Sequence, residues 1–173
     1  AALHLMRTGA AGVLVGFGGG AASTTRVTLG LHAPMATAVA DVAGARRDYL
    51  DESGGRYVHV IADGGVGTSG DIVKALAMGA DAVMLGVALA RATDAPGRGF
   101  HWGPEAHHAK LPRGHRVAVD RVGPLEQVLY GPAPVADGTA NLIGALKKSM
   151  ATTGYSDLKE FQRVEVVVAP YGH

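Results

Sequence analysis

Hydrophobic residues along the chain follow two different spacings. Short apolar runs at residues 12–17, 57–62 and 82–85 are typical of strands that are buried on both faces. Before and between these runs, apolar residues recur at helical spacing, which indicates helices with one buried face. The helical stripes consist of Leu3, Met6 and Ala10, then Met35, Val39, Val42 and Leu50, and finally Ile72, Val73 and Leu76.

Turn and cap residues divide the helices from the strands. Pro34 suits a first helical position, and Gly54 and Gly55 end that helix. Ser69 is the expected cap of the next helix, and Gly79 is its expected stop. Glycine-rich turns thus follow the strands, which is typical of β/α architecture with a parallel sheet. Ligands bind such sheets at the carboxyl ends of the strands, in a barrel or a doubly wound fold.

The second half of the chain is less regular. Residues 96–123 are rich in Gly, Pro and His without clear periodicity, so we expect a long surface loop and a candidate lid. Helices are predicted at 124–129, 139–153 and 156–161 from their start and stop signals. Residues 164–168 form either a terminal strand or an extended tail.

Composition limits the possible functions. The 173 residues are enough for one domain or a piece of one, and 47% are hydrophobic against 18% charged, which favours a packed core. A net charge of +1 gives no electrostatic footprint for nucleic acid or an anionic membrane. Cysteine is absent, which excludes disulfides, thiolate zinc sites and a cysteine nucleophile. We expect a cytoplasmic protein, because neither a membrane span nor a signal pattern is visible, and we expect a truncated front, because residues 1–7 read as the middle of a helix.

Two glycine-rich segments are the strongest candidates for chemistry. Residues 18–26, Gly-Gly-Gly-Ala-Ala-Ser-Thr-Thr-Arg, directly follow the first apolar run. Glycines let the backbone approach a ligand, so exposed N–H and C=O groups there can bind phosphate or a cation. Asp63, Gly64 and Gly65 follow the second apolar run in the same way. The sequence therefore predicts a small-molecule site built from strand ends.

Three segments, at 18–26, 61–76 and 79–86, resemble IMP dehydrogenase and GMP reductase. The resemblance extends from about Leu3 to Val168, is poor between Pro96 and Pro134, and is nearest to the IMP-dehydrogenase-related paralogue branch. It implies that residues 1–173 form a single partial domain, the C-terminal part of a (β/α)8 TIM barrel from roughly the sixth strand onward. A diverged loop and C-terminal helices would complete this α/β domain, with the N-terminal half of the barrel missing.

The resemblance also implies residue roles in the glycine loop. Ser23 stands where the family has the cysteine that attacks purine C2, and Thr25 would lie near the hydrolytic water. A hydroxyl needs an adjacent base to act as a nucleophile, and the sequence identifies none. Backbone carbonyls of Gly18, Gly20 and Ser23 would face a monovalent cation such as potassium. No other metal site is expected.

The Asp63 segment would bind the nucleotide itself. By resemblance, Asp63 accepts hydrogen bonds from the two ribose hydroxyls, while Gly64, Gly65 and Gly86 let backbone N–H groups approach the phosphate. Val87 replaces the serine that usually follows that last glycine, a loss of about 1 kcal/mol of phosphate affinity. The family's Arg-Tyr flap has no counterpart, and Arg113, Arg116 and Arg121 receive no role.

The function implied is that of a purine-nucleotide oxidoreductase in guanine nucleotide metabolism. It would bind IMP, XMP or GMP and transfer hydride at purine C2 with NAD or NADP, as a homo-oligomer that contacts neither nucleic acid nor membrane. The alternative is a catalytically impaired nucleotide-binding paralogue, because Ser23 replaces the cysteine. A third hypothesis is an inert fragment, whose open barrel would aggregate or oligomerise.

Simpler interpretations remain open for individual residues. Ser23 is a substituted nucleophile, a phosphate-binding hydroxyl or a helix cap, and Asp63 is a ribose ligand or a turn cap. His101, Trp102, His107, His108 and His115 suggest a metal site. A solvated loop is favoured instead, because no carboxylate or cysteine stands at ligand spacing.

Overall fold

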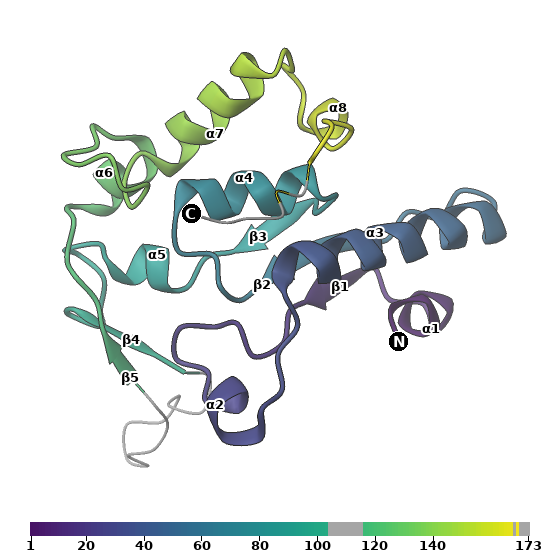
Figure 1. Ribbon diagram of the computed structural model, residues 1–173, viewed down its shortest axis with the longest axis horizontal. Coiled ribbons are helices and arrows are strands. Elements are labelled where there is room, and N and C mark those ends of the chain that lie inside the picture. Colours follow the sequence, from purple (N-terminus) through teal and green to yellow (C-terminus); the bar gives the residue numbers. More distant parts are fainter. Residues whose placement is uncertain (104–115, 168, 170–173) are drawn as a thin grey trace.

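The centre of the protein is a parallel sheet of three strands in the order β1-β2-β3 (Figure 1). The computed structural model describes residues 1–103, 116–167 and 169. Leu14 of β1 is in register with Ile61 of β2, which is in register with Ala82 of β3. The predicted β/α order and parallel pairing are therefore confirmed. The strands are β1 (Gly12–Val15), β2 (His59–Asp63) and β3 (Ala82–Met84).

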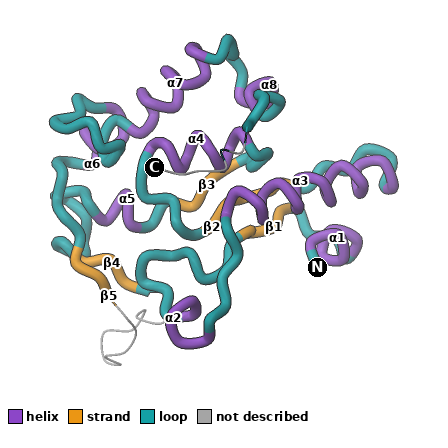
Figure 2. Tube along the Cα trace, viewed as in Figure 1, coloured by secondary structure: helices purple, strands orange, loops and turns teal. Residues whose placement is uncertain are grey.

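Helices cover one face of this sheet (Figure 2). Val13 and Val15 of β1 and Val60 and Ala62 of β2 point to that face and are buried, as the two-residue period of a strand requires. The covering helices bury Met6, Val39 and the Ile72 stripe against them. Their bounds are α1 (Ala2–Arg7), α3 (Met35–Glu52) and α4 (Ser69–Ala77).

The opposite face of the sheet is open. Leu14 is 61% exposed and Met84 47% exposed, although both are large apolar residues of the sheet. They occupy the alternate positions of β1 and β3, so the same alternation that buries Val13 and Val15 leaves them uncovered.

The C-terminal helices pack beside α4. α6 (Leu125–Tyr130), α7 (Leu142–Thr152) and α8 (Leu158–Phe161) agree with the predicted helices to within a few residues. α7 lies against α4, and the Phe161 ring at the end of α8 is completely buried. Residues 164–167 form no strand, so the extended tail is the correct alternative for them; residue 168 lies outside the described residues.

The interval 96–123 contains more structure than a surface loop. β4 (Phe100–Trp102) and β5 (Arg116–Ala118) form an antiparallel pair there, so the prediction of an irregular loop is wrong for these strands. Strands this short produce too few alternations for a period to show in the sequence. α2 (Thr25–Leu29) and α5 (Val87–Ala90) are likewise short helices that follow the ends of β1 and β3.

The cap of α4 also differs from the prediction. Thr68, not Ser69, is the N-cap, and its hydroxyl accepts a hydrogen bond from the Asp71 backbone N–H. The Asp71 carboxylate accepts the Thr68 N–H in return, at 3.1 Å. This reciprocal capping box needs an acceptor three residues into the helix, and Asp71 stands at that distance from Thr68, not from Ser69.

A cluster of polar side chains at the amino end of β3 links distant segments of the chain through hydrogen bonds and ion pairs. We call it the Asp81 cluster. It comprises Asp81, Arg46 of α3, Tyr57, Lys159 of α8 and Gln162. Arg46 Nη1 lies 2.6 Å from Asp81 Oδ2, and both side chains are more than 90% buried.

The charge state of Asp81 follows from these contacts. Burial by itself raises the pKa of Asp81, but hydrogen bonds from Lys159, Tyr57 and the Val60 N–H, with the Arg46 charge, outweigh it and lower the pKa to about 2. The carboxylate is therefore ionised at neutral pH and joins α3, β2, β3 and α8. None of the helices in the described part of the chain combines the length and the apolar character needed to cross a membrane.

Candidate functional site

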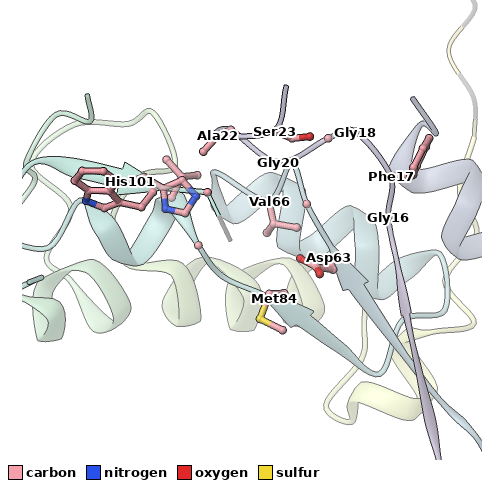
Figure 3. Close-up of a pocket in the computed structure, with 18 residues that line it drawn as sticks. Gly16, Phe17, Gly18, Gly20, Ala22, Ser23, Asp63, Val66, Met84 and His101 are labelled. Carbon is pink, nitrogen blue, oxygen red and sulfur yellow. The ribbon is translucent and has the colours of Figure 1, made fainter. Parts of the chain in front are cut away.

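A cavity of about 580 Å³ lies at the carboxyl ends of the three parallel strands (Figure 3). Its walls come from the glycine loop after β1, the turn after β2, the end of β3 and the start of α5, and the β4 strand. The cavity is lined by almost all of the site residues predicted from the sequence: Gly18, Gly20, Ser23, Asp63, Gly64, Gly65, Gly86 and Val87. Thr25, the first residue of α2, does not line it.

The glycine loop is closed at its base by a backbone pair. The Ala33 N–H donates to the Phe17 carbonyl at 3.0 Å. Within the loop, Gly18 has a φ of +72°, and a Cβ atom there would stand 2.5 Å from the Leu31 carbonyl oxygen. A Cβ on Gly16 would be 1.6 Å from the Asp63 carbonyl oxygen. These glycines let the first loop pass close to its neighbours.

The two glycine segments also pack directly on each other. A Cβ on Gly64 would lie 3.2 Å from the Gly20 amide nitrogen, and one on Gly65 would lie 3.3 Å from the Gly19 carbonyl oxygen. Gly64 and Gly65 have φ values of +104° and +74°, which side chains rarely adopt. The glycines therefore serve loop packing as well as any approach to a ligand.

Asp63 ends β2 and places its carboxylate in the cavity, near Val66 and Met84 in Figure 3. The residue is half-buried. Among the described residues, none donates a hydrogen bond to this carboxylate, so nothing there supports its interpretation as a turn cap. A half-buried carboxylate with free acceptor positions can receive two hydroxyl donors from a ligand.

Ser23 lies in a tight turn of the glycine loop, where its N–H donates to the Gly20 carbonyl at 2.9 Å. It does not cap the following helix, because the N-cap of α2 is Thr24. That alternative is therefore wrong. No basic group among the described residues is hydrogen-bonded to the Ser23 hydroxyl, which stays a nucleophile candidate without an activating base.

The cavity also contains side chains that the sequence does not assign to the nucleotide site, among them Phe17, Met84, His101 and Trp102. His101 and Trp102 belong to β4, and the metal hypothesis and the solvated-loop interpretation both miss their place in the cavity wall. A Cβ on Gly86 would lie 2.9 Å from His101 Cε1, so the imidazole rests on that glycine. The alternation Phe-His-Trp was the only available signal, and three residues are too few to reveal it.

Metal-binding geometry is not seen in the part of the chain that the structure describes, where no three His, Cys, Asp or Glu side chains cluster. His107, His108, His115 and Arg113 lie outside the described residues. A second cavity of about 380 Å³ lies beside the first, sharing Gly18, Gly19 and Gly20 with it, and contains Arg26 and His32.

Comparisons with known proteins agree on one family. The family described as IMP dehydrogenase / GMP reductase domain matches residues 1–170. An uncharacterized oxidoreductase of Mycobacterium leprae is 56% identical over 171 residues, 97% of this chain and 46% of that protein. The inosine-5'-monophosphate dehydrogenase of Aquifex aeolicus is 36% identical over 176 residues, 91% of this chain and 34% of that protein.

A solved structure agrees with these sequences. The IMP dehydrogenase/GMP reductase-like protein from Corynebacterium glutamicum superposes on this chain with a TM-score of 0.86 and 53% sequence identity. The matched region is 97% of this chain and 44% of the Corynebacterium chain. The chain thus spans less than half the length of each relative. The fold is IMP dehydrogenase/GMP reductase-like, which fits a partial TIM barrel. The chain belongs to the IMP dehydrogenase/GMP reductase family.

Proposed function

We propose that the cavity binds a purine nucleoside monophosphate, as part of an oxidoreductase that acts on the purine ring of that nucleotide. The single observation that carries this proposal is the placement of Asp63. Its half-buried carboxylate shares one cavity with the backbone of Gly64, Gly65 and Gly86. The carboxylate suits the two hydroxyls of a ribose, and the side-chain-free backbone suits a phosphate.

A nicotinamide dinucleotide, NAD or NADP, is the cofactor that we propose. The residues fit a flat ring in one respect, because Phe17 lines the cavity and is 50% exposed. The dinucleotide would supply the hydride acceptor or donor for purine C2. The part of this chain would be to hold the nucleotide through Asp63 and to keep the purine on the apolar side of the cavity.

A monovalent cation at the Gly18, Gly20 and Ser23 carbonyls is part of the same proposal. The Gly20 carbonyl already accepts the Ser23 N–H, so one of its two acceptor positions is occupied by the loop itself. The remaining position leaves room for one cation contact.

A catalytically impaired nucleotide-binding protein is the second candidate. The observation that favours it is Ser23, which stands at the nucleophile position and has no hydrogen-bonded base among the described residues. Nucleotide binding would survive this substitution, because Asp63 and the glycine turns do not depend on the Ser23 hydroxyl.

Titration calorimetry of the full-length protein with IMP, XMP and GMP tests nucleotide binding. We expect binding of at least one nucleotide, weakened about tenfold or more by Asp63→Asn, which keeps the size and removes the charged acceptor. Asp41→Asn, on the exposed side of α3, is the matched control and should leave affinity unchanged. Absence of binding by the unaltered protein would overturn both candidates.

Turnover separates the two candidates. Purified protein is incubated with the bound nucleotide and NAD or NADP, and the reduced or oxidised cofactor is followed by absorbance. Turnover that Asp63→Asn reduces supports the oxidoreductase. Tight binding without turnover supports the impaired protein.

A further inference from the structure

The β4–β5 hairpin presents its two faces to different surroundings. Phe100 and Trp102 alternate with His101 along β4, so they point to one face and His101 to the other. The Arg116 guanidinium of β5 lies over both rings of the first face, 4.4 Å from the Phe100 ring centre and 5.1 Å from that of Trp102. These cation–π contacts fix the rotation of β4 about its own axis.

This rotation aims His101 at the end of β3. Its imidazole lies against Gly86, where a Cβ would be 2.9 Å from Cε1 and 3.3 Å from Nε2. The ring is half-buried and lines the cavity (Figure 3). Neither ring nitrogen is hydrogen-bonded to a residue in the described part of the chain. The imidazole is therefore a donor that a ligand beside Gly86 can reach.

The charge distribution of the cavity favours an anion at this end. Among the described lining residues, Asp63 is the only carboxylate, and none is Lys or Arg. His101 is the only described lining residue with an imidazole, a ring that can donate a hydrogen bond. Val87, which follows Gly86, has no polar side-chain atom. A phosphate dianion is repelled by Asp63, so it is favoured away from that carboxylate, where the His101 imidazole can donate a hydrogen bond to it.

We infer that His101 is a phosphate-binding residue that donates a hydrogen bond to the 5′-phosphate of the nucleotide, next to the Gly86 backbone. The inference rests on the proposed function, because it assigns one end of the same cavity. It orients the nucleotide across the cavity, with the phosphate at the His101 end and the ribose at Asp63. The sequence pattern alone favours a solvated loop around His101.

A ligand-truncation experiment tests this role. Affinities for IMP and for inosine, which lacks the phosphate, are measured by calorimetry on the full-length protein and on His101→Ala. We expect His101→Ala to weaken IMP about tenfold or more and to leave inosine within about twofold. His101→Gln keeps a neutral donor and much of the volume, so it should retain part of the IMP affinity.

His4→Ala is the matched control, because His4 is an exposed histidine of α1 that lines neither cavity. Thermal melting of each variant shows that the hairpin still folds. Equal weakening of IMP and inosine would show that His101 stacks on the base instead, and no weakening of either would show that it is not a ligand. Either result overturns the assignment while the nucleotide site stands. If the unaltered protein binds neither molecule, the proposed function fails as well.

Discussion

Under the proposed function, Ser23 is the residue on which the chemistry of this site depends. Its side chain lies at the cavity wall, yet a serine hydroxyl is a poor nucleophile unless a base removes its proton. A thiol at the same place ionises far more readily, since the ordinary cysteine pKa is about 8.5. The loop is held by the hydrogen bond from the backbone N–H of residue 23 to the Gly20 carbonyl. Its geometry therefore does not depend on whether the side chain at position 23 ends in oxygen or sulfur.

We therefore predict that Ser23→Cys raises turnover of IMP with NAD or NADP by at least about tenfold. Initial rates measure the gain, and mass spectrometry of the quenched enzyme detects a nucleotide adduct on the new thiol. Thr24→Cys, one residue along and outside the cavity lining, is the control and should show no gain. Equal rates in Ser23→Cys and the unaltered protein would refute the nucleophile assignment of this position.

Gly16 is the residue where the site depends most on the absence of a side chain. A Cβ there would stand 1.6 Å from the Asp63 carbonyl oxygen, and neither backbone can retreat without breaking the β1–β2 pairing. We expect Gly16→Ala to lower the free energy of unfolding by about 2 kcal/mol or more. Urea denaturation measures the loss.

Gly44→Ala is the control for this change. Gly44 lies inside α3, where an added Cβ meets only the Arg47 guanidinium at 3.7 Å. Alanine favours a helix interior over glycine by about 1 kcal/mol, so this variant should be stabilised. An unchanged free energy of unfolding in Gly16→Ala would mean that the carboxyl ends of β1 and β2 can move apart, which contradicts the prediction.

At the level of elements, the Asp81 cluster determines how α8 is attached. α8 has only four residues and could not persist alone, but Lys159 and Gln162 bind Asp81 while Phe161 fills the core. The Phe161 ring also packs against Tyr155, with the two ring centres 5.9 Å apart and the rings edge to face. The sequence pattern alone does not reveal the role of Asp81, because its partners Arg46, Tyr57 and Lys159 come from segments far apart in the sequence.

The Asp81 cluster predicts a pH dependence of stability. The pKa of Asp81 is 3.8 in its ordinary state and about 2 in the folded protein, so the folded state favours the ionised form. Its contribution of about 2 kcal/mol is fully present above about pH 4 and disappears as the pH falls through 2. We expect Asp81→Asn to lose stability at neutral pH and to lose much less as the pH approaches 2.

Urea denaturation across this pH range measures the effect. Asp41→Asn removes a charge from the exposed side of α3 without touching the Asp81 cluster, and should leave the acid profile unchanged. If the free energy of unfolding falls with pH in the same way for Asp81→Asn and for the unaltered chain, another carboxylate causes the loss of stability in acid.

At the level of the whole molecule, the open face of the sheet is the dominant feature. Within the described residues, β1 and β3 each pair on one side only, with β2. Leu14 and Met84 add exposed apolar surface to these unpaired edges, and this combination promotes association. We propose that the protein works as a homo-oligomer, and the 173-residue chain by itself should self-associate through this face.

Sedimentation of the 173-residue chain tests this expectation. Leu14→Lys together with Met84→Lys should shift the chain toward monomer, because charges on the open face oppose its burial. Val27→Lys is the control, because Val27 of α2 is 88% exposed. This variant should not shift the chain toward monomer. A monomer that melts cooperatively without any substitution would contradict the prediction.

The sequence by itself determined the β/α order, the parallel strands and most of the cavity. Apolar runs, glycine stops and the Asp63-Gly64-Gly65 turn are local signals, and parallel strands bring their carboxyl ends together without further information. Only the tertiary structure decided that His101 faces Gly86, that Thr68 caps α4 and that Asp81 holds α8. These depend on the rotation of a three-residue strand, a difference of one residue in register, and contacts between distant segments. Such features leave no periodic trace in the chain, because they arise from packing between elements and not from the spacing within one.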